Sequence, residues 1–362
     1  MSGVPPTRVV RIGTAVRTVL QNTTRRMVPA PVALLELAAG FMATHAVYAV
    51  ARLGVADVLS DGPRTASDVA AEIGADPDAT YRLLRAGAMF GLVTENSDGQ
   101  FGLTPMGRTL RSGPDSMRDV VLMMGDPAYQ RAWSELTHTI QTGTPGAERA
   151  LGAPMWEYLD SHPEFAAVFN DAMTRLSQLD WPAIEAVYDF TRFSTIVDVG
   201  GGHGRQLALM LGASPSAKGV LLERDGLLAD AERLLGEAGV LARCRLEAGS
   251  FFDTAPSDGD LYVLRRVIHD FDDDQAVAIL TNVRRHMPRG STLLLMESVV
   301  PEGNTPHFAK TLDLDMMIFV GGRERTARQF ETLLDRAGLR ITRILPTVSP
   351  LSLVEAEPGR RS

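Results

Sequence analysis

Three ionisable residues in the carboxyl-terminal half have the side chains that proton transfer requires. His269 follows one apolar run, Glu297 ends another, and Glu324 lies in a segment that begins with two glycines. Imidazole takes up a proton near neutral pH, and a carboxylate on its second nitrogen selects the tautomer and stabilises the imidazolium. The three residues predict a general base able to deprotonate a hydroxyl, provided that the fold brings a glutamate to His269.

A glycine-rich segment at residues 197–204 predicts where a nucleotide-like cofactor binds. The apolar run 194–199 is followed by glycines at 200, 201, 202 and 204. Glycines let the backbone approach a ligand closely and adopt positive φ. The dinucleotide fingerprint needs a sixth-position glycine, where this chain has Arg205. Glycines at 200, 202 and 204 are instead typical of sites for S-adenosylmethionine (SAM).

Residues at the ends of neighbouring apolar runs complete the predicted cofactor site. Glu223 follows Asp198 by 25 positions and is placed to accept both hydroxyls of a ribose. Phe252, in the segment Gly249–Phe252, is our candidate for stacking on adenine, with core packing as the alternative. Arg265 is expected beside the cofactor, at the same sheet edge as His269.

The combination predicts methyl transfer to a hydroxyl. A phenol has a pKa of about 10 and is a poor nucleophile until it loses its proton, which a histidine base can accept. The methyl group of a sulfonium is already activated, so this chemistry needs no metal. Asp272, Asp273 and Asp274 resemble a metal cluster, but they precede the helix expected at 275–287. Helix capping is the stronger explanation, and we expect no metal site.

The elements that must position these residues follow an alternating pattern from Phe193 onward. Strands are expected at Thr195–Val199, Gly219–Glu223, Arg243–Ala248, Asp260–Leu264, Thr292–Glu297, Arg340–Leu345 and Ser352–Ala356. Helical segments separate most of them, which predicts an α/β, mostly parallel, doubly wound sheet with ligands at the carboxyl ends of its strands.

The amino-terminal part has the pattern of a winged helix-turn-helix. Thr65 and Asp76 are expected to cap two short helices, and the turn 96–99 is a hairpin signal. DNA binding is one interpretation of this shape. Asp76 and Asp78 would face phosphates unfavourably, so a dimerisation module is the better prediction.

Composition narrows the class of protein further. The 362-residue chain is long enough for two domains, and its net charge of −8 argues against a general nucleic-acid partner. A single cysteine, Cys244, suits a reducing compartment, so we expect a cytoplasmic protein. The apolar stretch 33–51 is interrupted by Glu36 and His45, which favours a buried amphipathic helix over a membrane span.

The first residues are expected to form a basic flexible tail. Five arginines precede Glu36, the first acidic residue, and no convincing signal peptide is present. Weak contact with an anionic surface or a partner is the alternative. The expected divisions are a tail at 1–31, a winged-helix dimerisation domain at 32–118, a helical connector with acceptor-pocket helices at 119–190, and a SAM-binding catalytic domain at 191–362.

These motifs together resemble the SAM-dependent O-methyltransferases that include plant caffeic-acid and flavonoid enzymes and bacterial enzymes acting on aromatic polyketides. The resemblance covers about residues 32–356. In order, it rests on the winged-helix region, Phe169–Met173, Val197–Gly204, Gly249–Phe252, Leu264–Phe271, Glu297 and Gly321–Thr326. Seven ordered matches are more specific than any one alone.

The resemblance implies a class I SAM-methyltransferase sheet of seven strands, with a winged-helix domain that intertwines two subunits into a homodimer. It implies that His269 is the general base, flanked by Glu297 and Glu324, and that Asp270 positions the cofactor or the base. The implied cofactor contacts are Asp198, Gly200, Gly202, Glu223, Ser250, Phe251, Phe252 and Arg265. Asn170 and Met173 would line the pocket of a small aromatic hydroxyl acceptor; Met316 and Phe319 suit an apolar cavity, although core packing explains them equally well.

Four positions depart from the family pattern. Ser250 stands where an aspartate commonly bonds the adenine amino group, so that contact is expected to be weaker. Arg265 replaces a lysine, Arg266 a tryptophan and Glu223 an aspartate. Two alternatives stay open: a SAM-sensing winged-helix transcriptional regulator, and a relative that catalyses hydroxylation or decarboxylation.

Overall fold

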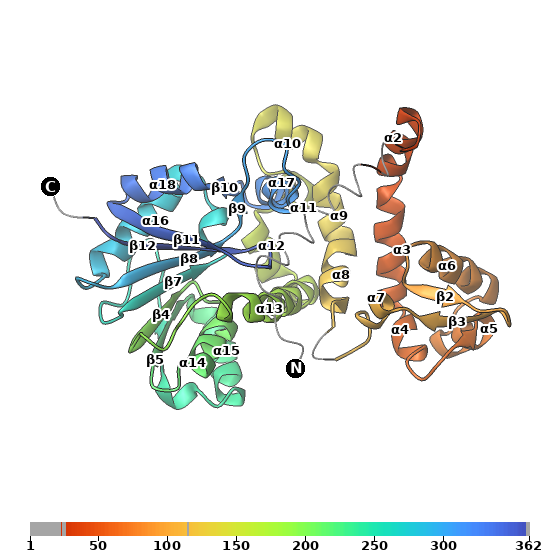
Figure 1. Cartoon of the computed structure of the whole chain (residues 1–362), viewed down its shortest axis with the longest axis horizontal. Coiled ribbons are helices and arrows are strands. Elements are labelled where there is room, and N and C mark those ends of the chain that lie inside the picture. Colours follow the sequence, from red (N-terminus) through yellow and green to blue (C-terminus); the bar gives the residue numbers. More distant parts are fainter. Residues whose placement is uncertain (1–22, 24–26, 114–115, 360–362) are drawn as a thin grey trace. The chain divides into compact units, whose positions relative to one another are not determined.

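The computed structural model describes Thr23 and residues 27–113 and 116–359, so the basic tail expected at 1–31 lies largely outside the described residues. The chain forms two compact units (Figure 1). The carboxyl-terminal unit comprises Glu135–Glu148 and Asp180–Ser362, and the amino-terminal unit comprises Val16–Ser134 and Arg149–Leu179.

A seven-stranded sheet is the centre of the carboxyl-terminal unit, and it confirms the predicted doubly wound α/β fold. Its strand order is β11-β12-β8-β7-β4-β5-β6. The strands β4 to β8 pair in parallel, whereas β12 pairs antiparallel with both β8 and β11. The strands span Thr195–Val199 (β4), Lys218–Glu223 (β5), Cys244–Ala248 (β6), Leu261–Arg265 (β7), Thr292–Glu297 (β8), Leu339–Pro346 (β11) and Ser352–Pro358 (β12).

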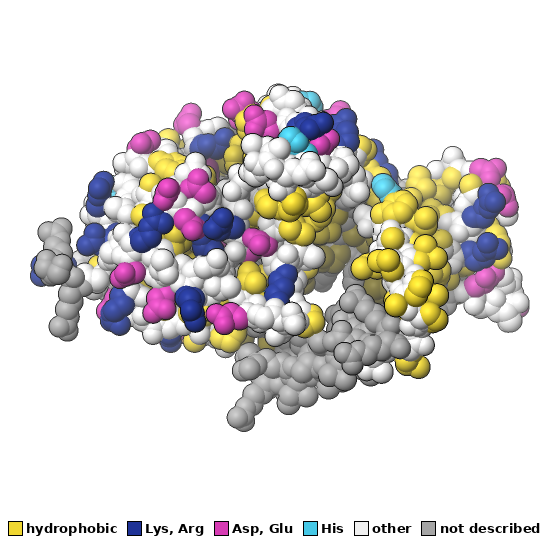
Figure 2. Space-filling model, turned by 90° about the horizontal axis from the view of Figure 1, so that it is seen from above, with side chains coloured by type: hydrophobic (Ala, Val, Ile, Leu, Met, Phe, Trp, Pro, Cys, Tyr) yellow, Lys and Arg dark blue, Asp and Glu magenta, His cyan; other side chains and the backbone are white. Residues whose placement is uncertain are grey.

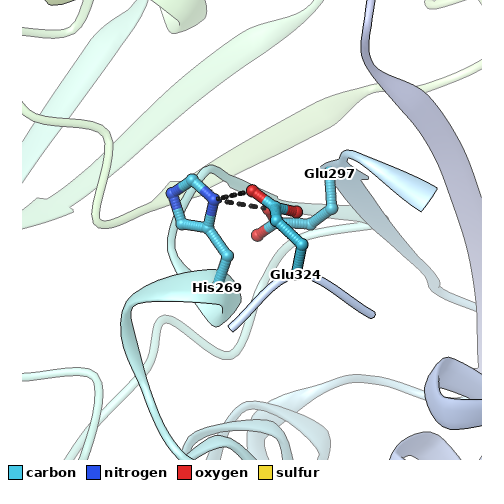
Figure 3. A group of neighbouring side chains, drawn as sticks. All are labelled: His269, Glu297 and Glu324. Carbon is cyan, nitrogen blue, oxygen red and sulfur yellow. Dashed lines mark hydrogen bonds and ion pairs between the residues drawn. The ribbon is translucent and has the colours of Figure 1, made fainter. Parts of the chain in front are cut away.

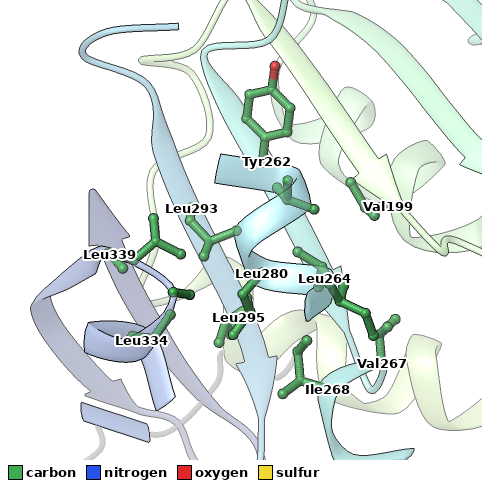
Figure 4. Packing of buried hydrophobic residues seen from close by; sticks show 14 of the residues in the cluster. Val199, Tyr262, Leu264, Val267, Ile268, Leu280, Leu293, Leu295, Leu334 and Leu339 are labelled. Atoms are coloured by element: carbon green, nitrogen blue, oxygen red, sulfur yellow. The ribbon is translucent and has the colours of Figure 1, made fainter. Parts of the chain in front are cut away.

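Helices cover both faces of this sheet, which explains why its central strands are apolar throughout. Alternate strand residues enter two different cores: Leu293 and Leu295 pack with α16 and α18 (Figure 4), whereas Leu294 packs with α14 and α15. The helical segments of the unit are α10 (Leu136–Thr142), α14 (Arg205–Ala213), α15 (Asp225–Glu237), η1 (Leu241–Arg243), η2 (Ile268–Asp270), α16 (Asp273–His286), α17 (Ala309–Phe319) and α18 (Ala327–Arg336). Two short strands, β9 (Val299–Val300) and β10 (Arg325–Thr326), pair in parallel.

The amino-terminal unit contains the expected short helices and wing. Thr65 accepts a hydrogen bond from the Asp68 N–H at 3.2 Å, and Asp76 accepts one from the Ala79 N–H at 2.8 Å, as the capping signals predict. Its elements are α2 (Ala30–Ala38), α3 (Gly40–Arg52), α4 (Val55–Val58), β1 (Arg64–Thr65), α5 (Ala66–Ile73), α6 (Pro77–Met89), β2 (Val93–Glu95), β3 (Gln100–Leu103), α7 (Pro105–Arg108), α8 (Arg118–Gly125), α9 (Pro127–Ser134) and α12 (Met155–Ser161), while α11 (Gly146–Leu151) and α13 (Pro163–Glu185) cross into the other unit.

The first helices of this unit are not the buried element that the sequence predicted. Helix α2 has no buried residue and α3 buries only Val50 and Ala51. Hydrophobic side chains gather over this part of the surface (Figure 2), and the exposed ones include Leu34, Leu35, Leu37, Phe41 and Met42. By length and composition alone, Ala30–Arg52 would also be able to cross a membrane, with a mean hydropathy of 1.5. A single chain therefore leaves a large apolar face uncovered.

A charge network around the buried Glu355 joins strands β11 and β12 to the segment that precedes β4. The Glu355 carboxylate on β12 accepts hydrogen bonds from the Tyr188 hydroxyl at 2.7 Å and from the Arg343 Nε at 3.0 Å. It also pairs with Arg192. These donors outweigh the cost of burial and lower the pKa of Glu355 to about 2, while burial and the adjacent carboxylate raise the pKa of Tyr188.

We expect Glu355→Gln to remove a pH-dependent part of the stability. The folded-state pKa lies below the ordinary value of 4.5, so the ionised carboxylate stabilises the fold above that pH, and this contribution is lost as pH falls towards about 2. Because the side chains of Arg192 and Arg343 are 41% exposed, solvent screening reduces this contribution to about 1–2 kcal/mol at neutral pH. Urea unfolding of both proteins across this pH range should show the gap in free energy of unfolding narrowing at acid pH. A gap that stays constant with pH would contradict the assignment.

Candidate active site

His269 is presented by a short 3₁₀ turn, η2, directly after β7 at the carboxyl edge of the sheet. Its Nδ1 lies 2.8 Å from Glu324 Oε1 (Figure 3), and the histidine is only 6% exposed. The two residues are 55 positions apart in sequence. A carboxylate that accepts from Nδ1–H leaves the lone pair on Nε2, so this pair has the geometry of an oriented base.

Glu297, at the end of β8, holds the backbone of the same turn. Its Oε1 accepts hydrogen bonds from the Val267 N–H at 3.1 Å and the Ile268 N–H at 2.9 Å. Its Oε2 is 3.7 Å from His269 Nδ1, beyond hydrogen-bond length. The structure thus brings both glutamates to the histidine, but only Glu324 bonds the ring.

Burial dominates the electrostatics of this cluster. It raises the pKa of Glu324 to about 8 and that of Asp270 to about 7, and it raises the pKa of Glu297 as well. Asp270 Oδ1 lies 3.4 Å from His269 Nε2, on the ring edge opposite Glu324. Three carboxyl groups this close cannot all ionise cheaply in a buried site.

The same cluster has the composition of a metal site, because one ligand atom from each of His269, Glu297 and Glu324 lies within 4.8 Å of the others. His269 Nδ1, Glu324 Oε1 and Glu297 Oε1 make the contacts given above, whereas Glu297 Oε2 and Glu324 Oε2 are buried with no hydrogen-bond partner among the described residues. The neighbouring acids have other partners: Asp272 caps α16 through the Gln275 N–H at 2.8 Å, as predicted, and Asp273 pairs with Arg325 at 2.8 Å.

The glycine loop after β4 leaves its backbone accessible, because glycine has no side chain. Gly200 and Gly202 have φ of 70° and 57°, a region that disfavours other residues. A Cβ on Gly200 would lie 3.1 Å from the Phe251 ring, whereas Gly202 faces open space. Glu223 Oε2 accepts a hydrogen bond from the Gly202 N–H at 2.8 Å, which places a carboxylate at the loop. The structure therefore brings Glu223 to the glycine loop, as a shared cofactor site requires.

The remaining predicted cofactor residues surround the same sheet edge. Asp198 is fully buried beneath the loop, and burial raises its pKa to about 7. The Ser250 hydroxyl accepts from the Phe252 N–H at 3.2 Å. Phe252 is 40% exposed and meets Phe271 edge-to-face at 5.3 Å, whereas Phe251 packs against the core. The exposed ring is the one available to a ligand.

Sequence reasoning missed the partner of Arg265. Asp180, from the end of α13, accepts hydrogen bonds from Arg265 at 3.0 Å and from Arg266 at 3.1 Å. Burial and the neighbouring Arg266 lower the pKa of Arg265 to about 10. Arg266 also has a φ of 52°, the only described non-glycine residue with positive φ. No local motif marks Asp180, which lies 85 positions before Arg265.

The acceptor residues fall on two different units. Met316 and Phe319 lie on α17, whose Asp313 accepts a hydrogen bond from the Glu324 N–H at 2.8 Å, so this helix is tied to the histidine cluster. Asn170 and Met173 are half-buried on the part of α13 that belongs to the amino-terminal unit. Their place in an acceptor site stays a prediction.

Comparison with known proteins yields matches over nearly the whole chain. Residues 133–340 match the O-methyltransferase domain family, and residues 35–113 match the O-methyltransferase dimerisation domain. The chain is 41% identical over 339 residues to the phenazine O-methyltransferase PhzM of Lysobacter antibioticus, covering 93% of this chain and 99% of that protein. It is 38% identical over 314 residues to 8-amino-8-demethylriboflavin N,N-dimethyltransferase of Streptomyces davaonensis, covering 85% and 90% of the two chains.

A solved structure agrees with these matches. The O-methyltransferase NcsB1 from neocarzinostatin biosynthesis, in complex with SAM and 2-hydroxy-5-methyl naphthoic acid, is similar with a TM-score of 0.74 and 35% identity. The match covers 87% of this chain and 96% of that one. This chain therefore belongs to the SAM-dependent O-methyltransferase family, whose members include both O- and N-methyltransferases.

Proposed function

We propose that this protein transfers a methyl group from SAM to the hydroxyl of a small aromatic or polyketide-like molecule, with His269 as general base. The observation that carries the proposal is the 2.8 Å contact between His269 Nδ1 and Glu324 Oε1 at the sheet edge that also holds the glycine loop. When bound, SAM supplies an electrophilic methyl group on a sulfonium.

The proposed step needs one proton transfer by the protein. His269 takes the hydroxyl proton on Nε2, and the oxygen then displaces the sulfur from the methyl carbon. Glu324 stabilises the imidazolium through Nδ1, and Glu297 keeps the turn in place through two backbone N–H groups. No protein nucleophile and no metal enters this scheme.

The base is the reason to favour oxygen over nitrogen as acceptor. The relatives include enzymes named for either atom. A neutral aromatic amine already presents a lone pair, whereas a phenol with a pKa of about 10 must lose its proton. A buried histidine that is oriented by a glutamate, as His269 is by Glu324, would be needed only for a hydroxyl acceptor. The aromatic acid bound in NcsB1 supports a flat aromatic molecule as acceptor.

We assign the ligand contacts as follows. Gly200 and Gly202 admit the cofactor, Glu223 accepts its ribose hydroxyls and Phe252 stacks on its adenine. Asp198, Ser250, Phe251 and Arg265 complete the cofactor site. Asn170, Met173, Met316 and Phe319 line the acceptor site, and Asp270 positions the base or the cofactor.

We also propose that the chain acts as a homodimer through residues 32–118, with the connector at 119–190 and the catalytic domain at 191–362. The dimerisation-domain match and the exposed apolar face of α2 and α3 support this. Leu37 and Phe41 are 68% and 58% exposed in one chain, and a second copy would remove them from water.

His269→Ala should reduce turnover by about 10²- to 10⁴-fold, because the hydroxyl loses its base. Binding of S-adenosylhomocysteine should stay close to wild type, since His269 is not assigned to the cofactor. Mass-shift assays over a panel of phenolic acceptors and calorimetric titration measure the two effects. Full activity in the variant would exclude His269 as the base.

The pH profile should reflect Glu324. Its carboxylate form, which orients Nδ1–H, is lost as pH falls below its pKa of about 8, so kcat at saturating substrates should decline through that region. Glu324→Gln should lower kcat and flatten this limb of the profile. A variant that keeps the wild-type profile would show that another group controls it.

Leu37→Glu combined with Phe41→Glu should convert a dimer into monomers, because a charged residue would be buried in the contact. Light scattering after size-exclusion chromatography measures the change, with Ile140→Glu, also at an exposed apolar residue, as the matched control. A wild-type chain that is monomeric at micromolar concentration, or that sediments with lipid vesicles, would contradict the dimer.

A further inference from the structure

We propose that Arg325 is a positioning residue for the catalytic histidine, acting through the backbone of the turn that presents His269. This inference rests on the proposed function, because it assumes that His269 is the base. Arg325 lies in the pair β9–β10 and follows Glu324 directly.

The guanidinium of Arg325 occupies the carbonyl side of this turn. Its Nη1 donates to the Ile268 carbonyl at 2.9 Å, and its Nη2 donates to the Phe271 carbonyl at 2.9 Å. These carbonyls lie on either side of His269 and Asp270. A 3₁₀ turn of three residues satisfies few of its own carbonyl groups, so outside donors decide its conformation.

An acidic residue fixes the guanidinium in turn. Asp273 Oδ1 accepts from Arg325 Nε at 3.0 Å and from Nη2 at 2.8 Å. The Arg325 side chain is 1% exposed, whereas that of Asp273 is 45% exposed. A buried arginine is costly unless its donors are bonded, and here the guanidinium bonds the carbonyls of Ile268, Phe271 and Arg323 as well as the Asp273 carboxylate.

The residues just before Glu324 also contact the turn that presents His269. The Arg323 N–H donates to the His269 carbonyl at 2.8 Å, and a Cβ on Gly322 would lie 2.0 Å from that oxygen. Arg325 also pairs in register with Val299, two residues after Glu297. The segment 322–325 thus holds the histidine ring through Glu324 and its backbone through Arg323 and Arg325.

A lysine at position 325 would keep the charge but could not bond both carbonyls and Asp273 with the same planar geometry. The turn would then move relative to Glu324 and the cofactor, and displacements near 1 Å cost on the order of 10²-fold in rate. Arg325→Lys should therefore lower kcat by about 10- to 100-fold and leave S-adenosylhomocysteine affinity within about twofold of wild type.

Arg336→Lys is the matched control. Arg336 also pairs with an acid at the start of α16, Asp274, but its side chain is 45% exposed. Both variants are made in the full chain and checked by thermal unfolding. The decisive measurement is the ratio of wild-type to Arg325→Lys kcat for acceptors of different hydroxyl pKa. This ratio should fall towards one for acidic phenols or at alkaline pH, where the hydroxyl ionises without a base. A purely structural role would lower all rates equally.

A second readout is independent of the acceptor. The imidazole ¹⁵N signals of His269, assigned by their loss in His269→Gln, should change in Arg325→Lys and stay unchanged in Arg336→Lys. If the wild-type protein methylates no hydroxyl, the proposed function fails, and these signals still test the positioning. If Arg325→Lys does not fold, Asp273→Asn should give a smaller defect with the same dependence on acceptor acidity. Wild-type kcat with unchanged signals, or a uniform rate loss, would overturn the proposal.

Discussion

Burial of one histidine together with three carboxyl groups is the constraint on which this site depends. Burial raises the pKa values of Glu324 and Asp270, and the carboxylates of Glu297 and Glu324 add to the shift of Asp270. Such a cluster is stable only when each group has a partner or a compensating charge. Glu297 accepts hydrogen bonds from two backbone N–H groups, and the charges of Arg266 and Arg325 lower the pKa of Glu324 against the effect of burial.

The sheet brings these partners together because parallel strands end at one edge. Strands β4, β5, β7 and β8 deliver the glycine loop, Glu223, the histidine turn and Glu297 to neighbouring positions. The crossing helices bury both faces and fix the strand order. The residues that we propose for catalysis and cofactor binding thus lie on one rigid support, which would keep a methyl donor and a base in fixed relation.

A second group of charged residues, Asp180 with Arg265 and Arg266, adjoins the histidine turn. Asp180 bonds two adjacent arginines, and Arg266 keeps a left-handed backbone conformation where most residues would be strained. The positive charge of Arg266 also opposes the raised pKa values of Glu297, Glu324 and Asp270. At position 266 this chain therefore has a cation that favours ionised carboxylates around His269.

Local sequence determined the strands, the glycine loop and the helix caps at Thr65, Asp76 and Asp272, because these depend on periodicity, positive φ and contacts within a few residues. The candidate acids could be named by their places at strand ends. Only the tertiary structure decided that Glu324 bonds the histidine ring whereas Glu297 bonds its backbone, and that Asp180 and Arg325 complete the charge balance. It also showed α2 and α3 exposed rather than buried. The hydrogen bonds of Glu324, Glu297, Asp180 and Arg325 join residues up to 86 positions apart. These contacts depend on which strands and turns lie side by side in the fold, and no pattern of neighbouring residues in the sequence predicts that.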